Sequence, residues 1–183
     1  MPGWAEATTY AELLALARRF LAGELDRFPG WGAGDLDEES DALRPALLHA
    51  TAAGILPVAS QPGEPFAPGH DGHAWGRRAF VGGFVDPQRC DAVVGAITDR
   101  GLVALVQGPR VPPTAQSVPV GLRDGTPFLV LGPDARAHEL EIFGEAVGPG
   151  AAAALEACPF MWLVDPQWGR RAALPRALES LPR

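Results

Sequence analysis

Residues 53–63 read AGILPVASQPG and residues 77–85 read RRAFVGGFV, and these two stretches decide the fold that the sequence predicts. Each contains a short apolar run, Ile55 to Ala59 and Ala79 to Val85, bounded by glycine, proline or charged residues, as is typical of a buried strand. The first run ends at Ser-Gln-Pro-Gly, in which Pro-Gly is the dipeptide of a type II turn. We therefore expect two strands joined by a turn and a longer connection.

The connection between the two strands, residues 61–76 (QPGEPFAPGHDGHAWG), holds three prolines and four glycines. This composition predicts the longest irregular segment of the chain, and long ordered loops tend to be functional. Gly82-Gly83 within the second strand predicts a bulge or a close backbone approach.

Local signals on either side of this region predict the other elements. Thr9 and Glu12 have the spacing of a capping box, Ser40 is a candidate helix cap, and Asp124-Gly125 between apolar runs predicts a hairpin. The run from Leu102 to Val106 is continuously apolar, which is typical of a central strand. We expect helices over 10–25, 40–53, 87–101, 134–147, 150–158 and 171–181, and further strands over 102–106, 118–122, 128–131 and 160–164.

This order of elements predicts an α/β (α+β) fold: one mixed, largely antiparallel sheet of five to six strands with helices packed on it. The connections do not alternate as a doubly wound fold requires. At 183 residues the chain fits a single α/β domain over residues 1–183.

The composition excludes some classes of partner. The net charge of −7 disfavours nucleic acid and anionic membrane surfaces. The chain has no lysine and no asparagine, whose codons are A-rich, and this indicates a bacterium with a GC-rich genome. Two distant cysteines make no disulfide framework, and no signal peptide or long apolar run is visible, so we expect a cytoplasmic protein.

The strongest group of candidate ligand-binding residues surrounds the 61–76 connection: Ser60, Gln61, Trp75, Arg77 and Arg78. Polar side chains at the end of a buried strand point into a crevice beside the sheet. Gln61 offers a donor and an acceptor, and an arginine can clamp a carboxylate or phosphate. The alternative is a structured turn whose polar groups satisfy the loop backbone. On the first interpretation, the 60–63 tetrapeptide and Arg78 share one solvent-reachable hollow.

The same connection carries the candidate catalytic residues His70, Asp71 and His73. Histidine titrates near neutral pH, so these residues fit general acid–base chemistry. A metal site would need a third or fourth ligand that no other cluster supplies, and a Ser60–His70–Asp71 triad lacks a Gly-x-Ser-x-Gly elbow. We therefore expect no metal. No phosphate-binding glycine motif is present, so we expect no cofactor. Asp165, after the 160–164 strand, fits a catalytic carboxylate but more simply a turn.

The two opening stretches also resemble a family of small, uncharacterised actinobacterial domains, in which Ser-Gln-Pro-Gly is followed by a Gln-Arg-Ala-x-Val-x-Gly-Phe strand. The resemblance covers roughly residues 40–106, and Arg77 stands where the family has glutamine. It implies that the Ser-Gln-Pro-Gly turn and the arginine that opens the next strand belong together. The matching positions are Ser60, Gln61, Pro62, Gly63, Arg78, Ala79, Gly83 and Phe84.

These observations predict a small-molecule-directed enzyme or ligand-binding domain of unspecified reaction in bacterial specialised metabolism. If it is an enzyme, we expect metal-independent histidine acid–base chemistry on a polar small molecule. The alternative is a non-catalytic interaction module, such as an immunity or accessory protein, which the negative charge and three tryptophans expected to be exposed, Trp4, Trp31 and Trp75, would favour.

Overall fold

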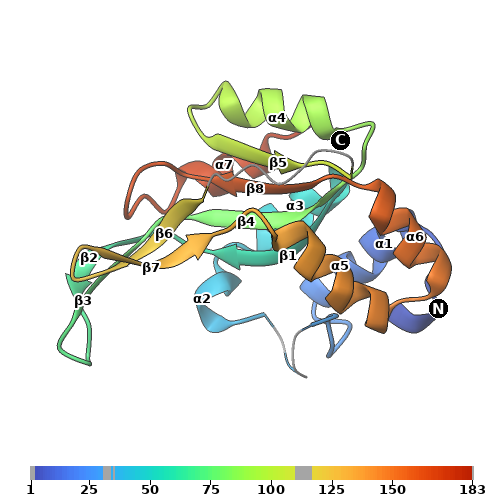
Figure 1. Cartoon of the computed structure of the whole chain (residues 1–183), viewed down its shortest axis with the longest axis horizontal. Coiled ribbons are helices and arrows are strands. Elements are labelled where there is room, and N and C mark those ends of the chain that lie inside the picture. The colour runs from blue at the N-terminus through green and yellow to red at the C-terminus, as the bar shows by residue number, and fades with distance from the viewer. Residues whose placement is uncertain (1–2, 31–33, 35, 110–116, 183) are drawn as a thin grey trace.

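The computed structural model describes residues 3–30, 34, 36–109 and 117–182 (Figure 1). The strands are β1 (Ile55–Gln61), β2 (Glu64–Pro68), β3 (Ala74–Arg77), β4 (Phe80–Val85), β5 (Val103–Gln107), β6 (Val118–Arg123), β7 (Thr126–Leu131) and β8 (Phe160–Val164). A 3-10 turn, η1 (Trp4–Glu6), precedes the helices α1 (Tyr10–Leu21), α2 (Glu38–Asp41), α3 (Arg44–Ala52), α4 (Cys90–Thr98), α5 (Ala135–Ala146), α6 (Pro149–Ala157) and α7 (Ala173–Glu179). None of these helices is both long enough and apolar enough to cross a membrane.

The strands form two four-stranded sheets, in the orders β1-β4-β8-β5 and β2-β3-β6-β7. Every ladder between the described strands is antiparallel. The α+β class is therefore as predicted, but the single mixed sheet of five to six strands is not. The difference arises mainly in residues 61–76, which we expected to be irregular and which contain β2 and β3.

A sharp bend joins the two sheets. β1 runs into β2 and β3 runs into β4 with two residues between each pair, so that one long antiparallel ribbon belongs to both sheets. At the bend the backbone N–H of Arg78 donates to the carbonyl of Val120 in β6, at 2.8 Å. The next residue, Ala79, accepts instead from the N–H of Asp165, which follows β8, at 2.9 Å. The ribbon therefore changes its neighbour from one sheet to the other within two residues.

Gly63 lies on the inner side of this bend. A Cβ atom built on it would lie 2.6 Å from the carbonyl oxygen of Arg170 and 3.2 Å from the backbone nitrogen of Ala79. Both contacts are with backbone, so only glycine fits. The Ser-Gln-Pro-Gly turn and the arginine of the next strand thus lie side by side, at a bend in a ribbon rather than at a type II turn.

The first sheet holds most of the core. On one of its faces Phe84 packs edge-to-face against Phe160 and Phe143 of α5, with ring centroids 5.3 and 6.1 Å apart. α3 packs on β1 and contacts α1 and α7, while α4 lies over β5 (Figure 1). Trp162 lies over Gly82, where a Cβ would come within 2.1 Å of its ring. A Cβ on Gly83 would lie 2.4 Å from the carbonyl oxygen of Leu56, so the close backbone approach occurs as predicted. The register shifts opposite this glycine pair, but the extra residue is on β1, between Pro57 and Ala59.

Several expected elements differ at their ends or in their place. α1 has the predicted capping box but stops at Leu21. The single helix expected over 40–53 is two, α2 and α3, because Pro45 restarts the helix in its first turn. β5 is an edge strand and not a central one; α4 packs on it, but its residues are only partly buried and Val106 is 38% exposed. Trp4 packs against Phe28 instead of being exposed, and Trp31 lies outside the described residues.

Candidate functional site

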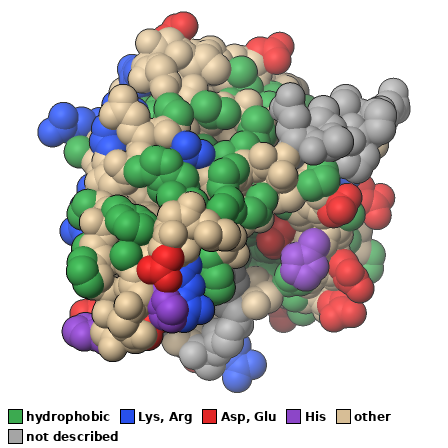
Figure 2. Space-filling view, turned by 60° about the vertical axis from the view of Figure 1, so that its left-hand side comes forward, with side chains coloured by type: hydrophobic (Ala, Val, Ile, Leu, Met, Phe, Trp, Pro, Cys, Tyr) green, Lys and Arg blue, Asp and Glu red, His purple; other side chains and the backbone are tan. Residues whose placement is uncertain are grey.

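A hollow of about 650 Å³ lies over the second sheet, on the face that carries Trp75 and Arg77. These two residues point to the same side of β3 because side chains alternate along a strand. The hollow joins β2, the β2–β3 turn, β7 and the segment before α7, which together bring His70, Asp71, Phe128 and Arg171 to its wall. Figure 2 shows this side of the molecule, where hydrophobic side chains surround a small group of acidic, basic and histidine side chains.

Two aromatic rings form the apolar wall of the hollow. Phe128 packs edge-to-face on Trp75, with centroids 5.1 Å apart, and is 64% exposed. The indole N–H of Trp75 donates to Oδ1 of Asp71 at 3.0 Å, and the guanidinium of Arg123 lies 5.2 Å from the Trp75 ring centre. This indole hydrogen bond is the main reason that the pKa of Asp71 lies below its ordinary value, with the His73 N–H and the Arg123 charge also lowering it. Trp75 is therefore held in place before any ligand binds.

The charged wall contains two arginines that differ in their partners. Arg77 is paired with Glu39 and lies 3.5 Å from Oε2 of Glu64. Arg171 donates from Nε to the carbonyl of Gly63 at 3.0 Å, and its Nη2 lies 4.0 Å from Oε1 of Glu64. A second hollow, of about 210 Å³, shares Glu64 and Arg171 with the first, so this pair borders both hollows.

His73 lies beside the hollow and does not line it. Its Nδ1 is 2.6 Å from Oδ2 of Asp124, whose Oδ1 accepts the N–H of Ala74 at 2.8 Å. The Ala74 N–H, followed by the His73 hydrogen bond, holds the pKa of Asp124 below its ordinary value. The pair ties the tip of the β2–β3 hairpin to the β6–β7 turn, where Asp124 and Gly125 both have positive φ, 50° and 79°. An aspartate that orients an imidazole is also found in acid–base sites. Here, however, neither His73 nor Asp124 lines the hollow.

The structure does not bring Ser60, Gln61 and Arg78 into the same hollow as the residues above. Ser60 borders a separate apolar hollow next to α1 and α3, and its carbonyl accepts from Oγ of Ser40 at 3.1 Å. Gln61 is buried, at 9% exposed, and its Nε2 has no partner among the described residues. Arg78 donates from Nη1 to the carbonyl of Pro119 at 2.9 Å and lies 4.2 Å from the ring centre of Trp168. Strand alternation and the bend point these three side chains in different directions.

Asp165 stabilises the bend. It is fully buried and accepts two hydrogen bonds from Arg170, at 2.5 Å from Nε and 2.7 Å from Nη2. Its Oδ1 also accepts the N–H of Gln167 at 3.0 Å. These three hydrogen bonds all lie within residues 165–170, so Asp165 organises the loop whose Arg170 carbonyl packs against Gly63, and the turn interpretation fits its surroundings.

Sequence reasoning placed His70, Asp71, Trp75 and Arg77 in one segment, and the structure brings these four to one hollow. It missed Phe128, Arg171 and Asp124, which come from distant parts of the chain. Of these, only Asp124 had a signal, its position in a predicted turn. Among the described residues, no three His, Cys, Asp or Glu side chains lie close enough together to hold a metal ion.

Comparison with known proteins gives a family and no activity. A family model described as "Domain of unknown function (DUF6919)" matches residues 2–181. No curated protein matches the chain. The matched range includes the bend, both hollows and every described strand, so these features belong to the region that defines the family.

Proposed function

The chain belongs to the DUF6919 family, and from that starting point we propose that it is a ligand-binding domain for a polar small molecule, held in the hollow beside Trp75. One observation carries the proposal. Two rings and two arginines from three separate segments meet at a hollow of about 650 Å³. Ligand sites in proteins typically have volumes of roughly 300–1,000 Å³ and combine an apolar wall with a few placed polar groups.

Preorganisation supports the same proposal. Trp75 is hydrogen-bonded to Asp71, Arg77 is paired with Glu39, and Arg171 is bonded to the carbonyl of Gly63. Side chains that are already held lose little conformational entropy when a ligand binds, so more of the interaction energy appears as affinity.

The geometry favours binding over catalysis. Among the described residues that line the hollow, only His70 has a side chain that ordinarily titrates near neutral pH. No described residue donates to or accepts from the His70 ring to orient it, and the better-oriented His73 lies outside the hollow. A general base must reach the proton that it removes, within hydrogen-bond distance of a bound substrate. Acid–base chemistry by His70, Asp71 or His73 therefore stays a hypothesis beside the binding function.

Two matched substitutions test the proposal. Phe128→Ala removes the exposed ring from the wall of the hollow, whereas Phe66→Ala removes a ring that is 52% exposed on the same sheet and does not line it. A panel of aromatic and polar metabolites is screened by ¹H–¹⁵N spectra, in which the Trp75 indole signal is assigned with Trp75→Phe. We expect at least one compound to shift that signal, with affinity lost in Phe128→Ala and retained in Phe66→Ala. A panel that never shifts it, or equal effects of the two substitutions, would count against the proposal.

The proposed setting is the cytoplasm of a bacterium with a GC-rich genome, in specialised metabolism. The absence of lysine and asparagine codons supports the genome assignment. Cys90 and Cys158 are both free thiols, which fits a reducing compartment. The neighbouring genes test the metabolic setting: a biosynthetic cluster would support it, and an adjacent toxin gene would favour an immunity protein.

A second candidate function, a non-catalytic interaction module, is favoured by strand β7. This edge strand has no charged residue, and Phe128, Leu129 and Val130 are 64, 39 and 43% exposed. Exposed edge strands that lack charges pair readily with another chain. Because β7 is neutral, two copies could meet along it despite the net charge of −7. Hydrogen exchange of the β7 amides that slows as protein concentration rises would favour this function, and exchange independent of concentration would speak against it.

A further inference from the structure

The basic residues of the hollow differ in how much hydrogen-bonding capacity they keep. Arg77 is shared between two carboxylates, Glu39 and Glu64. Arg171 is 66% exposed, and the nearest carboxylate oxygen, on Glu64, is 4.0 Å away, beyond hydrogen-bond distance. Its Nε–H donates to the carbonyl of Gly63 at 3.0 Å, which fixes the guanidinium, and within the described part of the chain its two terminal nitrogens donate no hydrogen bond. Arg171 is therefore the arginine in this wall that is best able to bind an anion.

The aromatic wall offers a complementary surface for a flat ring. Phe128 is mostly exposed, and its edge-to-face contact with Trp75 leaves an L-shaped pair of rings at one side of the hollow. Arg123 stacks near Trp75 but is 3.5 Å from Oδ2 of Asp71, so its charge is already paired. A ring of the ligand can pack against Phe128 and Trp75 without disturbing this pair.

From these two surfaces we infer that the site takes an aromatic monocarboxylate, with its ring against Trp75 and Phe128 and its carboxylate on Arg171. The inference rests on the proposed function and adds to it the chemical class of the ligand. Arg171 lines the larger hollow together with both rings, so a ligand held there can reach the guanidinium and the ring wall at once.

The carboxylates around the hollow favour a single negative charge over a double one. Glu64 and Asp71 line the larger hollow, and Glu39 and Glu64 line the smaller one. A phosphate dianion on Arg171 would be repelled by Glu64 nearby, and the net charge of −7 adds to this repulsion. A carboxylate has half that charge and still fits the planar fork of a guanidinium.

Three compounds that share one ring system test the inference: 2-naphthoate, neutral 2-naphthamide and 2-naphthyl phosphate. Each is titrated into the full chain, and binding is followed by the Trp75 indole signal and by calorimetry. We expect 2-naphthoate to bind about tenfold or more tightly than 2-naphthamide, the ratio typical of a charge-assisted hydrogen bond, and more tightly than the phosphate. Added salt should weaken the binding of 2-naphthoate and leave that of the amide nearly unchanged.

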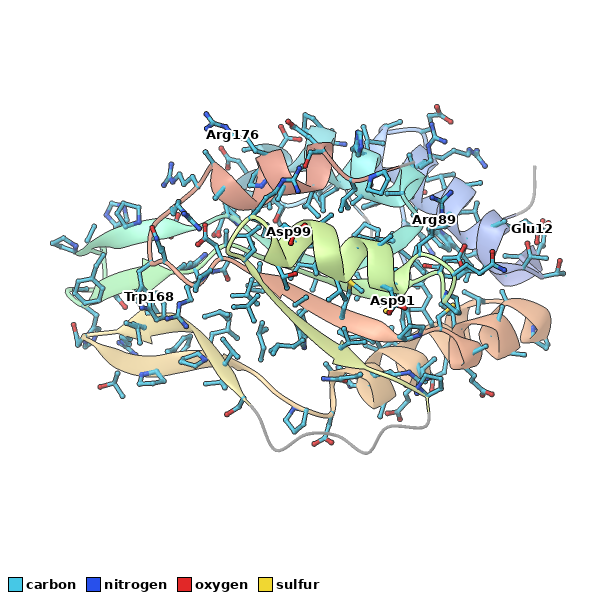
Figure 3. All side chains as sticks on the ribbon, turned by 90° about the horizontal axis from the view of Figure 1, so that it is seen from above. Glu12, Arg89, Asp91, Asp99, Trp168 and Arg176 are labelled. Atoms are coloured by element: carbon cyan, nitrogen blue, oxygen red, sulfur yellow. The ribbon has the colours of Figure 1, made fainter. Side chains whose placement is uncertain are left out.

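Arg171→Gln should reduce the affinity for 2-naphthoate to that for 2-naphthamide. Arg176→Gln is the matched control, because Arg176 is an exposed arginine on the outer side of α7 (Figure 3) and lines neither hollow. Melting temperatures of both variants establish that they are folded. If Arg171→Gln does not fold, the comparison of the three compounds on the unmodified chain still decides the question.

The outcomes separate the two claims. If the amide binds as tightly as 2-naphthoate and still shifts the Trp75 signal, the inference of a carboxylate falls and the ligand-binding function stands. If the phosphate binds most tightly, the inference of a single charge is overturned. If none of the three compounds shifts the Trp75 signal although other metabolites do, the ligand class is wrong. If nothing shifts it, the proposed function fails with the inference.

Discussion

Replacing Gly63 with alanine adds one methyl group at the bend that joins the two sheets. That Cβ would lie 2.6 Å from the carbonyl oxygen of Arg170, 3.0 Å from its carbonyl carbon and 3.2 Å from the nitrogen of Ala79. All three are backbone atoms. The carbonyl belongs to the loop that Asp165 holds through its ion pair with Arg170, so it cannot move without weakening that pair. The substitution must therefore push two well-anchored segments apart.

The expected cost follows from this contact. Overpacking a well-packed site costs typically about 1–3 kcal/mol, and because no flexible side chain can give way here we expect the upper end, about 3 kcal/mol. For a domain of 150–250 residues, each kcal/mol lowers the melting temperature by about 2–4 °C, which gives a decrease of roughly 6–12 °C in this chain.

The assay is thermal unfolding followed by circular dichroism, with Gly95→Ala as the matched control. Gly95 lies within α4, and a Cβ built on it meets nothing within 4 Å. The same chemical change should therefore stabilise the helix, by about 0.5–1 kcal/mol. Opposite signs at the two positions are the expected result. If Gly63→Ala melted within a degree or two of the unmodified chain, the description of the bend as closely packed would be refuted.

Three further predictions concern other groups. The pKa of Asp124 is depressed in the folded state by the Ala74 N–H and then by His73, so the stability from these contacts is present above about pH 4 and is lost as the pH falls through the folded pKa. Asp124→Asn should therefore flatten the acid limb of melting temperature against pH, and a curve parallel to that of the unmodified chain would contradict this. Asp165→Ala leaves Arg170 without its carboxylate partner, but the Arg170 side chain is 34% exposed and can reach water. We therefore expect the free energy of unfolding in urea to fall by about 2 kcal/mol, less than the ~3–5 kcal/mol typical of a fully buried pair. An unchanged urea midpoint would show that the pair does not stabilise the fold. Burial raises the pKa of the Cys158 thiol to about 12, so it should react with Ellman's reagent at pH 8 only after denaturation, and rapid labelling of this position in the native protein, located by mass spectrometry, would show that the site is open.

Features that depend on neighbouring residues could be predicted from the sequence. The Thr9–Glu12 capping box, the Asp124-Gly125 turn and the strand over 160–164 all occur in the structure. Each is decided by contacts within a few residues, by backbone conformation or by a run of buried side chains. The glycine pair at 82–83 was also informative, because a glycine within a strand indicates that another group occupies the place of its side chain. Here these groups are the ring of Trp162 and the backbone of Leu56.

Features that depend on position within a sheet could not be predicted. Pro65 and Pro68 made residues 61–76 read as a loop, but β2 is an edge strand, where a missing N–H breaks no ladder. The apolar run of β5 indicated a central strand, whereas its covering comes from α4. Both errors have one cause: local composition does not reveal how many neighbours a strand has.

The candidate site divides in the same way. His70, Asp71, Trp75 and Arg77 are close in sequence, and a hairpin keeps them close in space. Gln61 and Arg78 flank the same hairpin, but the bend turns them elsewhere. Arg171 reaches the hollow because its segment packs against Gly63, and no sequence pattern near residue 171 predicts that contact.

The second sheet joins the rest of the molecule mainly through the ribbon at Gly63 and Arg78, and of its strands only Val120 and Leu131 add buried hydrophobic side chains to the core. Segments with so few buried contacts open at lower free energy than the molecule as a whole. Pre-melting of this outer sheet would abolish the hollow while the helices stay intact. A ligand bound in the hollow should therefore slow amide exchange in β3, β6 and β7 markedly, while it raises the temperature of global unfolding only slightly.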